Sequence, residues 1–128
     1  MGADREAPEV RLPLTPEVFH ILLALADGER HGYSIMQEIV AQTDGKLRIG
    51  PTTLYRSIKR MLEDGLIEEM EERPDPALDD ERRRYYRLTE LGLQVARAEV
   101  QRLAQAVEVA RQKPLLGDAV LKPMFGGA

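Results

Sequence analysis

The chain of 128 residues contains no cysteine and no tryptophan, and aromatic residues make up only 5% of it. Without cysteine, the protein cannot form a disulfide, a thiolate nucleophile or a thiolate metal site. Its two histidines, His20 and His31, fall in different predicted elements, so they form neither a metal site nor a catalytic pair. A glycine-rich phosphate loop is also missing, because Gly126 and Gly127 stand at the very end. We therefore expect no enzyme activity, no metal and no cofactor.

Long apolar runs are missing as well. No run approaches the roughly 18 residues that a membrane span requires. Residues 1–13 contain three acids and no apolar core of a signal peptide. The absence of cysteine is compatible with a reducing cytoplasm, and we expect a cytoplasmic protein without membrane contact. With 43% hydrophobic residues, a chain of this length fits one domain with an appended helix.

The net charge of −4 argues at first against nucleic-acid binding, but the charges are distributed unevenly. Between residues 46 and 60, all charged residues are basic: Lys46, Arg48, Arg56, Lys59 and Arg60. A second basic cluster consists of Arg82, Arg83, Arg84 and Arg87. Acids concentrate between residues 63 and 81. This distribution predicts a basic surface on an acidic protein.

Residues 50–67 are the most informative segment. Pro51 suits a first helical turn, and Gly65 suits the left-handed residue that ends a helix. One predicted face is apolar: Leu54, Ile58, Met61 and Leu62. The opposite face carries polar and charged residues: Thr52, Arg56, Lys59, Arg60 and Glu63. Such a helix suits the major groove of DNA, although the pattern alone would also fit an ordinary helix with a solvated basic face.

The segments around this helix favour the DNA reading. A first helix is expected from Thr15, which can cap it, to a stop at Asp27-Gly28, and a second from Tyr33 to near Gly45. We predict a short strand over residues 46–49. Two further strands are predicted over residues 66–72 and 82–88, joined by a turn-rich tip at residues 74–80.

This order of elements is that of a winged helix-turn-helix, a mainly α fold of the α+β class, whose third helix is offered to DNA. Several single residues carry expectations of their own. Tyr85 and Tyr86 point to opposite faces of their strand, so at most one is core. His31 is expected in a structural turn, and Gly32 and Gly50 are expected to serve backbone geometry. Four apolar residues are expected in the core: Leu22, Leu54, Ile58 and Met61.

A long last helix is predicted from the cap Thr89 to about Lys113. Its apolar residues follow spacings of three and four over about three heptads: Leu93, Ala96, Val100, Leu103, Val107 and Ala110. We expect this seam to pair with a second copy, with packing on the chain's own first helix as the alternative. The first helix is apolar on more than one side, so Phe19 is assigned to the dimer contact. There it could also line a cleft for an effector, and a core position is the alternative. The expected division is a flexible arm at 1–13, a DNA-binding domain at 14–89, a dimerisation helix at 90–113 and a tail of unknown role at 114–128.

Four segments together resemble the PadR family of bacterial transcriptional regulators, over roughly residues 14–113. They are His31-Gly32-Tyr33-Ser34-Ile35, residues 50–55 (GPTTLY), residues 59–67 (KRMLEDGLI) and residues 84–89 (RYYRLT). The resemblance implies a homodimeric winged helix-turn-helix repressor. Family members bind inverted repeats in double-stranded DNA and often release it on binding a small molecule. The single short terminal helix looks like that of the smaller subfamily, in which this helix completes the dimer.

The predicted DNA contacts lie on the third helix and on the second strand of the hairpin. We assign base readout to Arg56, and phosphate contact to Thr52, Thr53, Lys59 and Arg60. Tyr55 lies at the edge of this face, where either a phosphate contact or half-buried packing is open. Because residues 74–81 form an acidic tip that would repel phosphates, the hairpin contacts are assigned to Arg82, Arg83 and Arg84.

Two questions stay open at this point. A winged-helix module that binds an acidic protein partner, without specific DNA binding, is the alternative function. A small-molecule effector is not identified by the sequence, and the place predicted for it is a cleft between the first and last helices of the dimer.

Overall fold

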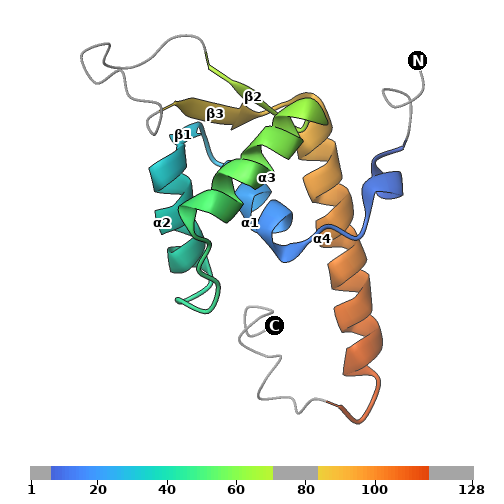
Figure 1. Cartoon of the computed structure of the whole chain (residues 1–128). Coiled ribbons are helices and arrows are strands. Elements are labelled where there is room, and N and C mark those ends of the chain that lie inside the picture. Colours follow the sequence, from blue (N-terminus) through green and yellow to red (C-terminus); the bar gives the residue numbers. More distant parts are fainter. Residues whose placement is uncertain (1–6, 71–83, 116–128) are drawn as a thin grey trace.

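The computed structural model describes residues 7–70 and 84–115, apart from the side chains of Glu9 and Val10. The described chain is mostly helical, with one small antiparallel sheet and a long last helix (Figure 1). The elements in order are η2 (Pro8–Arg11, a 3-10 helix), α1 (Pro16–Ala24), β1 (Arg30–His31), α2 (Gly32–Gln42), α3 (Pro51–Glu63), β2 (Ile67–Glu69), β3 (Tyr85–Leu88) and α4 (Glu90–Arg111). The expected mainly α fold with a small β component is confirmed.

The helices begin where local chemistry predicts. The Thr15 hydroxyl accepts a hydrogen bond from the Val18 amide at 3.2 Å, and that of Thr89 accepts one from the Gly92 amide at 3.0 Å. Each bond satisfies one amide of a first helical turn, which has no partner within the helix. After the C-terminal end of α3, Gly65 has φ +77°, as expected of a glycine that ends a helix.

The sheet has the strand order β1-β3-β2, so β3 is central. The strand predicted over residues 46–49 is wrong. That segment forms no strand, and the third strand is instead the two-residue β1, whose Arg30 pairs with Tyr86 of β3. A strand requires a partner, and residues 46–49 are held by a local turn instead, in which the Leu47 amide donates to the Thr43 hydroxyl at 3.1 Å. On β3, Tyr86 is buried and Tyr85 half-buried, so one of the two is core, as predicted.

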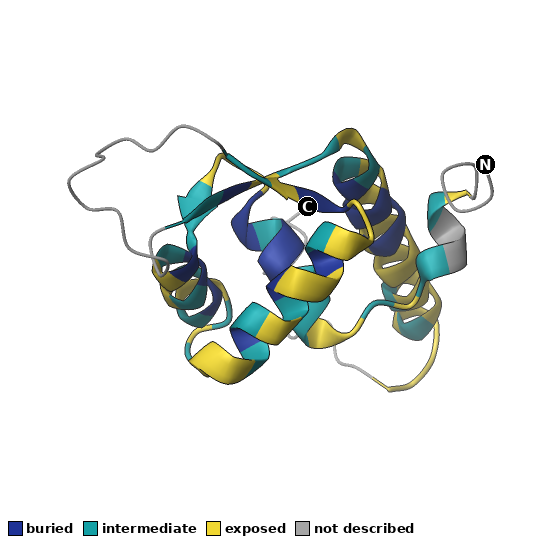
Figure 2. Ribbon diagram, turned by 45° about the horizontal axis from the view of Figure 1, so that its top comes forward, coloured by how far each residue is buried: buried dark blue, intermediate teal, exposed yellow. Residues whose placement is uncertain are grey.

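The core forms where α1, α2 and α3 pack together with the sheet and with the first half of α4. The four predicted core residues are confirmed, each at most 2% exposed: Leu22, Leu54, Ile58 and Met61. Figure 2 shows buried residues gathered between the helices and exposed ones along the outer side of α3. Burial of each such side chain contributes about 1.5–3 kcal/mol to stability, so these contacts set how α3 lies on the domain.

Of the arm predicted at residues 1–13, the structure describes the part from residue 7 onwards. Its described part packs against α4 through η2, and Leu12 and Leu14 lie against the core. Glu99 of α4 is 2% exposed, and its carboxylate accepts a hydrogen bond from the Leu14 amide at 3.0 Å. Arg102 holds the other side of that carboxylate, with Nε 2.6 Å from Oε1. The hydrogen bond from Arg102 is the main reason that the pKa of Glu99 is lowered, against the opposing effect of burial.

Gly92 allows the close approach of α4 to the start of the hairpin, and we expect Gly92→Ala to destabilise the protein. A Cβ at Gly92 would clash with the Leu66 carbonyl oxygen and would lie 3.0 Å from its carbonyl carbon. Helix propensity alone would make alanine more favourable by about 1 kcal/mol. We expect instead a loss of about 1–3 kcal/mol in the free energy of unfolding, because backbone must move. Urea denaturation measures this change in the free energy of unfolding.

Gly50→Ser is the matched control for that variant. A Cβ at Gly50 meets no atom within 4 Å in the part of the chain that the structure describes, and serine is a preferred N-cap residue. Its stability should be unchanged or slightly raised. A stabilised Gly92→Ala protein would contradict the close approach.

Glu99 should make stability depend on pH. Its pKa is lowered in the folded protein, so its contribution is complete above the ordinary value of about 4.3 and is lost as the pH falls below it. At pH 7, Glu99→Gln should therefore lower the free energy of unfolding by about 1–3 kcal/mol, because charge-assisted hydrogen bonds are weakened. The difference between the two proteins should shrink below pH 4.3.

Glu108→Gln serves as the control, since Glu108 pairs with Arg111 at 3.3 Å on the same helix but is 52% exposed. Exposed pairs of this kind contribute little. Equal effects of the two substitutions at pH 7 would argue against a special role of Glu99.

Candidate nucleic-acid interface

The outer face of α3 is a continuous polar surface opposite a buried stripe. Leu54, Ile58 and Met61 are buried, whereas four of the predicted DNA-contact residues are exposed: Thr52, Arg56, Lys59 and Arg60. The predicted division of this helix into two faces is therefore confirmed. Thr53 and Tyr55 are half-buried at the border between these faces.

The basic side chains on this face are scarcely paired with acids of the described chain, so their charge is available to a partner. Arg56 and Lys59 form no ion pair with any residue that the structure describes. The one ion pair of Arg60 places its Nε 3.9 Å from the Asp64 carboxylate, with the Arg60 side chain 78% exposed. A pair this long and this exposed neutralises little charge. The face can thus attract an anionic partner such as a nucleic-acid backbone.

Tyr55 has a packing role that the sequence left open. Its ring lies against Gly32, where an added Cβ would come within 2.9 Å of the ring carbon Cζ. Gly32 therefore serves the close approach of α2 and α3. The expectation for Gly50 is wrong, because Gly50 has φ −74° and a Cβ there meets no described atom within 4 Å.

The turn before α2 contains a positioning residue that the sequence analysis missed. Arg30 Nε donates to the Ala24 carbonyl oxygen at 2.7 Å, and its Nη1 donates to the Ser34 hydroxyl at 3.1 Å. The same guanidinium pairs with Asp27 at 3.5 Å and Glu38 at 3.4 Å, so it joins the end of α1 to α2. An arginine after a helix stop is the signal that was available, since the last carbonyls of a helix lack partners.

His31 caps α2, as its predicted turn role implies. Its Nδ1 accepts a hydrogen bond from the Ser34 amide at 3.1 Å. Its ring meets the Tyr85 ring edge to face, with centroids 5.4 Å apart. His31 thus ties the start of α2 to β3.

Of the hairpin's basic cluster, the structure describes Arg84 and Arg87. Arg82, Arg83 and the tip at residues 74–81 lie outside the described residues. Arg84 is half-buried, with its Nε 3.6 Å from the Glu69 carboxylate. On the same hairpin, Arg87 Nε lies 2.7 Å from Glu68. The described hairpin arginines, Arg84 before β3 and Arg87 on it, therefore face acids of β2, which makes Arg84 a weaker candidate for phosphate contact than the sequence implied.

The predicted dimer seam on α4 is exposed only in part. Ala96 is 7% exposed and packs in the core of its own chain, so it offers little surface to a second copy, and its assignment to the dimer contact stays a prediction. Val100 and Leu103 are 46% and 36% exposed and stay available to a second copy. The remaining seam residues are half-buried: Leu93, Val107 and Ala110.

Phe19 on α1 is half-buried, which leaves its assignment between core and dimer contact as a prediction. Its ring contacts that of His20 with centroids 5.6 Å apart. Burial lowers the pKa of His20, and its Nδ1 lies 3.1 Å from the Gln42 amide nitrogen. His20 thus links α1 to α2.

Within residues 7–70 and 84–115, no group of three acids or histidines is placed to hold a metal ion. In the same ranges, no helix combines the length and apolarity needed to cross a membrane.

Comparison with known proteins places this geometry in context. Residues 21–98 match the model of the "Transcriptional regulator PadR-like family", which is more than half of the chain. A relative from Lysinibacillus sphaericus, "Uncharacterized protein X", is 35% identical over 72 residues, which cover 56% of this chain. That match spans 63% of the relative, less than two thirds of its length.

Solved structures share the fold. A transcriptional regulator from Clostridium thermocellum, Cth-833, is 27% identical with a TM-score of 0.61, and the match covers 77% of this chain and 89% of that one. Bacillus subtilis PadR, solved in complex with operator DNA, is 18% identical with a TM-score of 0.58, covering 78% and 62% of the two chains.

Proposed function

Since the chain belongs to the PadR-like family of transcriptional regulators, we propose that it is a homodimeric repressor that binds an inverted-repeat operator in the cytoplasm. The observation that carries this proposal is the face of α3. It presents Thr52, Arg56 and Lys59 to solvent while the opposite face is buried. A helix of this kind can enter the major groove, where arginine pairs bidentately with guanine and the remaining polar side chains contact phosphates.

The dimer is supported by the apolar residues that α4 leaves uncovered. Val100 and Leu103 are one turn apart on the part of α4 that follows the core. A second copy of the same helix would cover them in a two-fold interface. Two copies would then present their α3 helices to successive major grooves, about 34 Å apart.

The structure of Bacillus subtilis PadR with operator DNA is a precedent for the fold in this role. By analogy, α3 is the helix of the present protein that reads the bases, and Arg82 and Arg83, rather than the ion-paired Arg84, supply the hairpin's contacts to the DNA phosphates. The competing function is a winged-helix module that binds an acidic protein. DNA binding that is both selective and steeply salt-dependent separates the two.

Fluorescence anisotropy with a labelled duplex tests this function. A specific site is first enriched from a pool of random duplexes, and a scrambled duplex serves as control. We expect tight binding to the enriched site, with affinity falling on the order of a thousandfold between 50 and 200 mM salt. Failure to enrich any duplex at low salt would favour the protein-binding module.

Arg56→Ala should weaken binding to the enriched duplex by about 1–3 kcal/mol and relax preference at one base pair. Lys59→Ala, on the same face, should weaken binding to all duplexes about equally, because a phosphate contact carries no sequence information. Anisotropy against single-base variants of the site measures both. If Arg56→Ala also weakened all sequences equally, its base-reading role would be refuted.

Leu103→Asp should convert the dimer to monomers and abolish tight DNA binding, because two charges would meet in an apolar contact. Sedimentation velocity and anisotropy are the measurements. Val109→Asp is the matched control, since Val109 is 47% exposed on the same helix but lies off the seam. A dimer that survives Leu103→Asp, or that is lost equally in Val109→Asp, would overturn the seam.

A further inference from the structure

Two cations, Lys46 and Arg48, lie on the segment of residues 43–50 that joins α2 to α3. Both are exposed, and neither forms an ion pair with any residue that the structure describes. The one acid of this segment, Asp44, is also exposed and has no ion pair within the described chain. No acid follows between residues 46 and 60. The charge of these two turn cations is therefore available to a partner.

Hydrogen bonds to the end of α2 hold this turn in shape. Thr43 Oγ1 donates to the Ile39 carbonyl oxygen at 2.8 Å and accepts from the Leu47 amide at 3.1 Å. Gly45 has φ +77°, and its amide donates to the Val40 carbonyl oxygen at 2.8 Å. The backbone that carries the turn cations is therefore ordered before a partner binds, which lowers the entropy cost of binding.

Burial alternates along the segment that leads into α3. Leu47 packs against the core and Ile49 is 8% exposed, whereas the turn cations beside them are exposed. Burial of the two apolar side chains is favourable and fixes the side on which the cations lie. The helix α3 begins two residues after Ile49, and its Thr52 is exposed as well. The turn cations thus continue the polar surface of α3 beyond the start of the helix.

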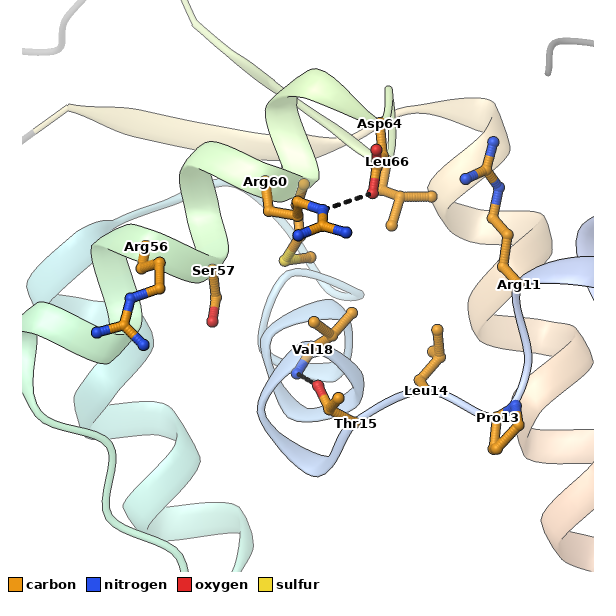
Figure 3. A pocket seen from close by; sticks show the side chains of 11 residues that line it. Arg11, Pro13, Leu14, Thr15, Val18, Arg56, Ser57, Arg60, Asp64 and Leu66 are labelled. Carbon is orange, nitrogen blue, oxygen red and sulfur yellow. Dashed lines mark hydrogen bonds and ion pairs between the residues drawn. The ribbon is translucent and has the colours of Figure 1, made fainter.

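The basic face of α3 is directed toward this turn at one of its ends. Figure 3 shows the Arg56 side chain directed toward the start of α3, whereas Arg60 is directed toward Asp64 near the end of the helix. The residue assigned to base readout therefore lies between Arg60 and the turn cations. A helix in the major groove is bordered by phosphate backbones, and the segment that leads into it lies close to one of them.

The described arginines of the hairpin differ from the turn cations. Arg84 lies 3.6 Å from the Glu69 carboxylate, and Arg87 lies 2.7 Å from that of Glu68. A cation whose charge is already offset by an acid gains less from a phosphate and releases fewer counterions than a free one. Among the described residues outside α3, the turn cations are therefore the stronger candidates for contact with the DNA backbone.

We propose that Lys46 and Arg48 bind DNA phosphates beside the groove that α3 enters, and that they fix the orientation of α3 in that groove. This inference rests on the proposed function and deepens it. Phosphate contacts carry no sequence information, so the turn cations contribute affinity and register, while base preference stays with α3.

Lys46→Gln and Arg48→Gln test this inference through the salt dependence of binding. Anisotropy is measured with the enriched and the scrambled duplex over roughly 50–200 mM salt. We expect each substitution to weaken both duplexes by the same factor, about tenfold near 100 mM salt, and to lower the slope of log affinity against log salt by about 0.9. Slopes equal to that of the parent, or a loss confined to the enriched duplex, would overturn the inference.

Arg87→Gln is the matched control. It removes the same charge from a side chain that is 54% exposed but paired with Glu68. We expect less than half the change in slope that Arg48→Gln causes. Equal changes would overturn the inference, because net charge and not position would then explain both.

Arg48→Lys separates loss of the contact from damage to the turn. Lysine binds phosphate as a point charge, so this variant should keep the slope of the parent. All variants should keep the urea midpoint of the parent, because the substituted side chains are exposed. An Arg48→Lys protein that behaves like Arg48→Gln would overturn the phosphate contact.

Ethylation interference locates the contact on the DNA. Ethylation removes the charge of a single phosphate, and the positions at which it blocks binding are compared for the parent and Arg48→Gln. We expect the phosphate that faces Arg48 in each half-site to stop interfering in the variant. The same pattern in both proteins would refute the turn contact and leave the proposed function standing. A parent protein that binds no duplex would refute the proposed function, and this inference with it.

Discussion

The burial of one stripe of α3 is the constraint on which the rest of the candidate interface depends. Leu54, Ile58 and Met61 are each at most 2% exposed, and together they would lose several kcal/mol if α3 turned about its axis. The direction in which Arg56 and Lys59 point is therefore determined by these buried side chains, which do not themselves contact a binding partner. The basic face contributes little to folding itself, and its residues are free to specify what is bound.

A second constraint comes from a single buried carboxylate. Glu99 receives the Leu14 amide on one side and the Arg102 guanidinium on the other, so the segment before α1 is held against α4. This contact places Leu14 and Arg11 beside α3, where they line a pocket of about 390 Å³ (Figure 3). A charge that is out of contact with water would be costly without both partners. The same bonds thus satisfy Glu99 and shape the pocket.

The parts of the fold that could be predicted from the sequence depend on neighbours within a few residues. The caps Thr15 and Thr89, the buried stripe of α3 and the glycine at its end are local, and all are confirmed. Strand β1 was missed because two residues have no pattern of their own and are defined by pairing with β3. Glu99 looked like any polar position on a helix, since its burial depends on a segment 85 residues away. The pocket was missed for the same reason, because its lining comes together only through tertiary packing.

The missing side chain at Gly92 affects how the hairpin and α4 can move relative to each other. With no side chain there, the first turn of α4 rests on the Leu66 carbonyl, and the Thr89 amide donates to that same oxygen at 3.1 Å. The hairpin and α4 therefore join without a hinge, and the end of α3 lies three residues before Leu66. In the proposed dimer, this junction makes α3, which enters the DNA groove, and α4, which pairs with the second copy, move as one rigid unit. The distance between the two half-sites is then a fixed property of the protein, and an operator with altered spacing must itself bend or twist to be bound.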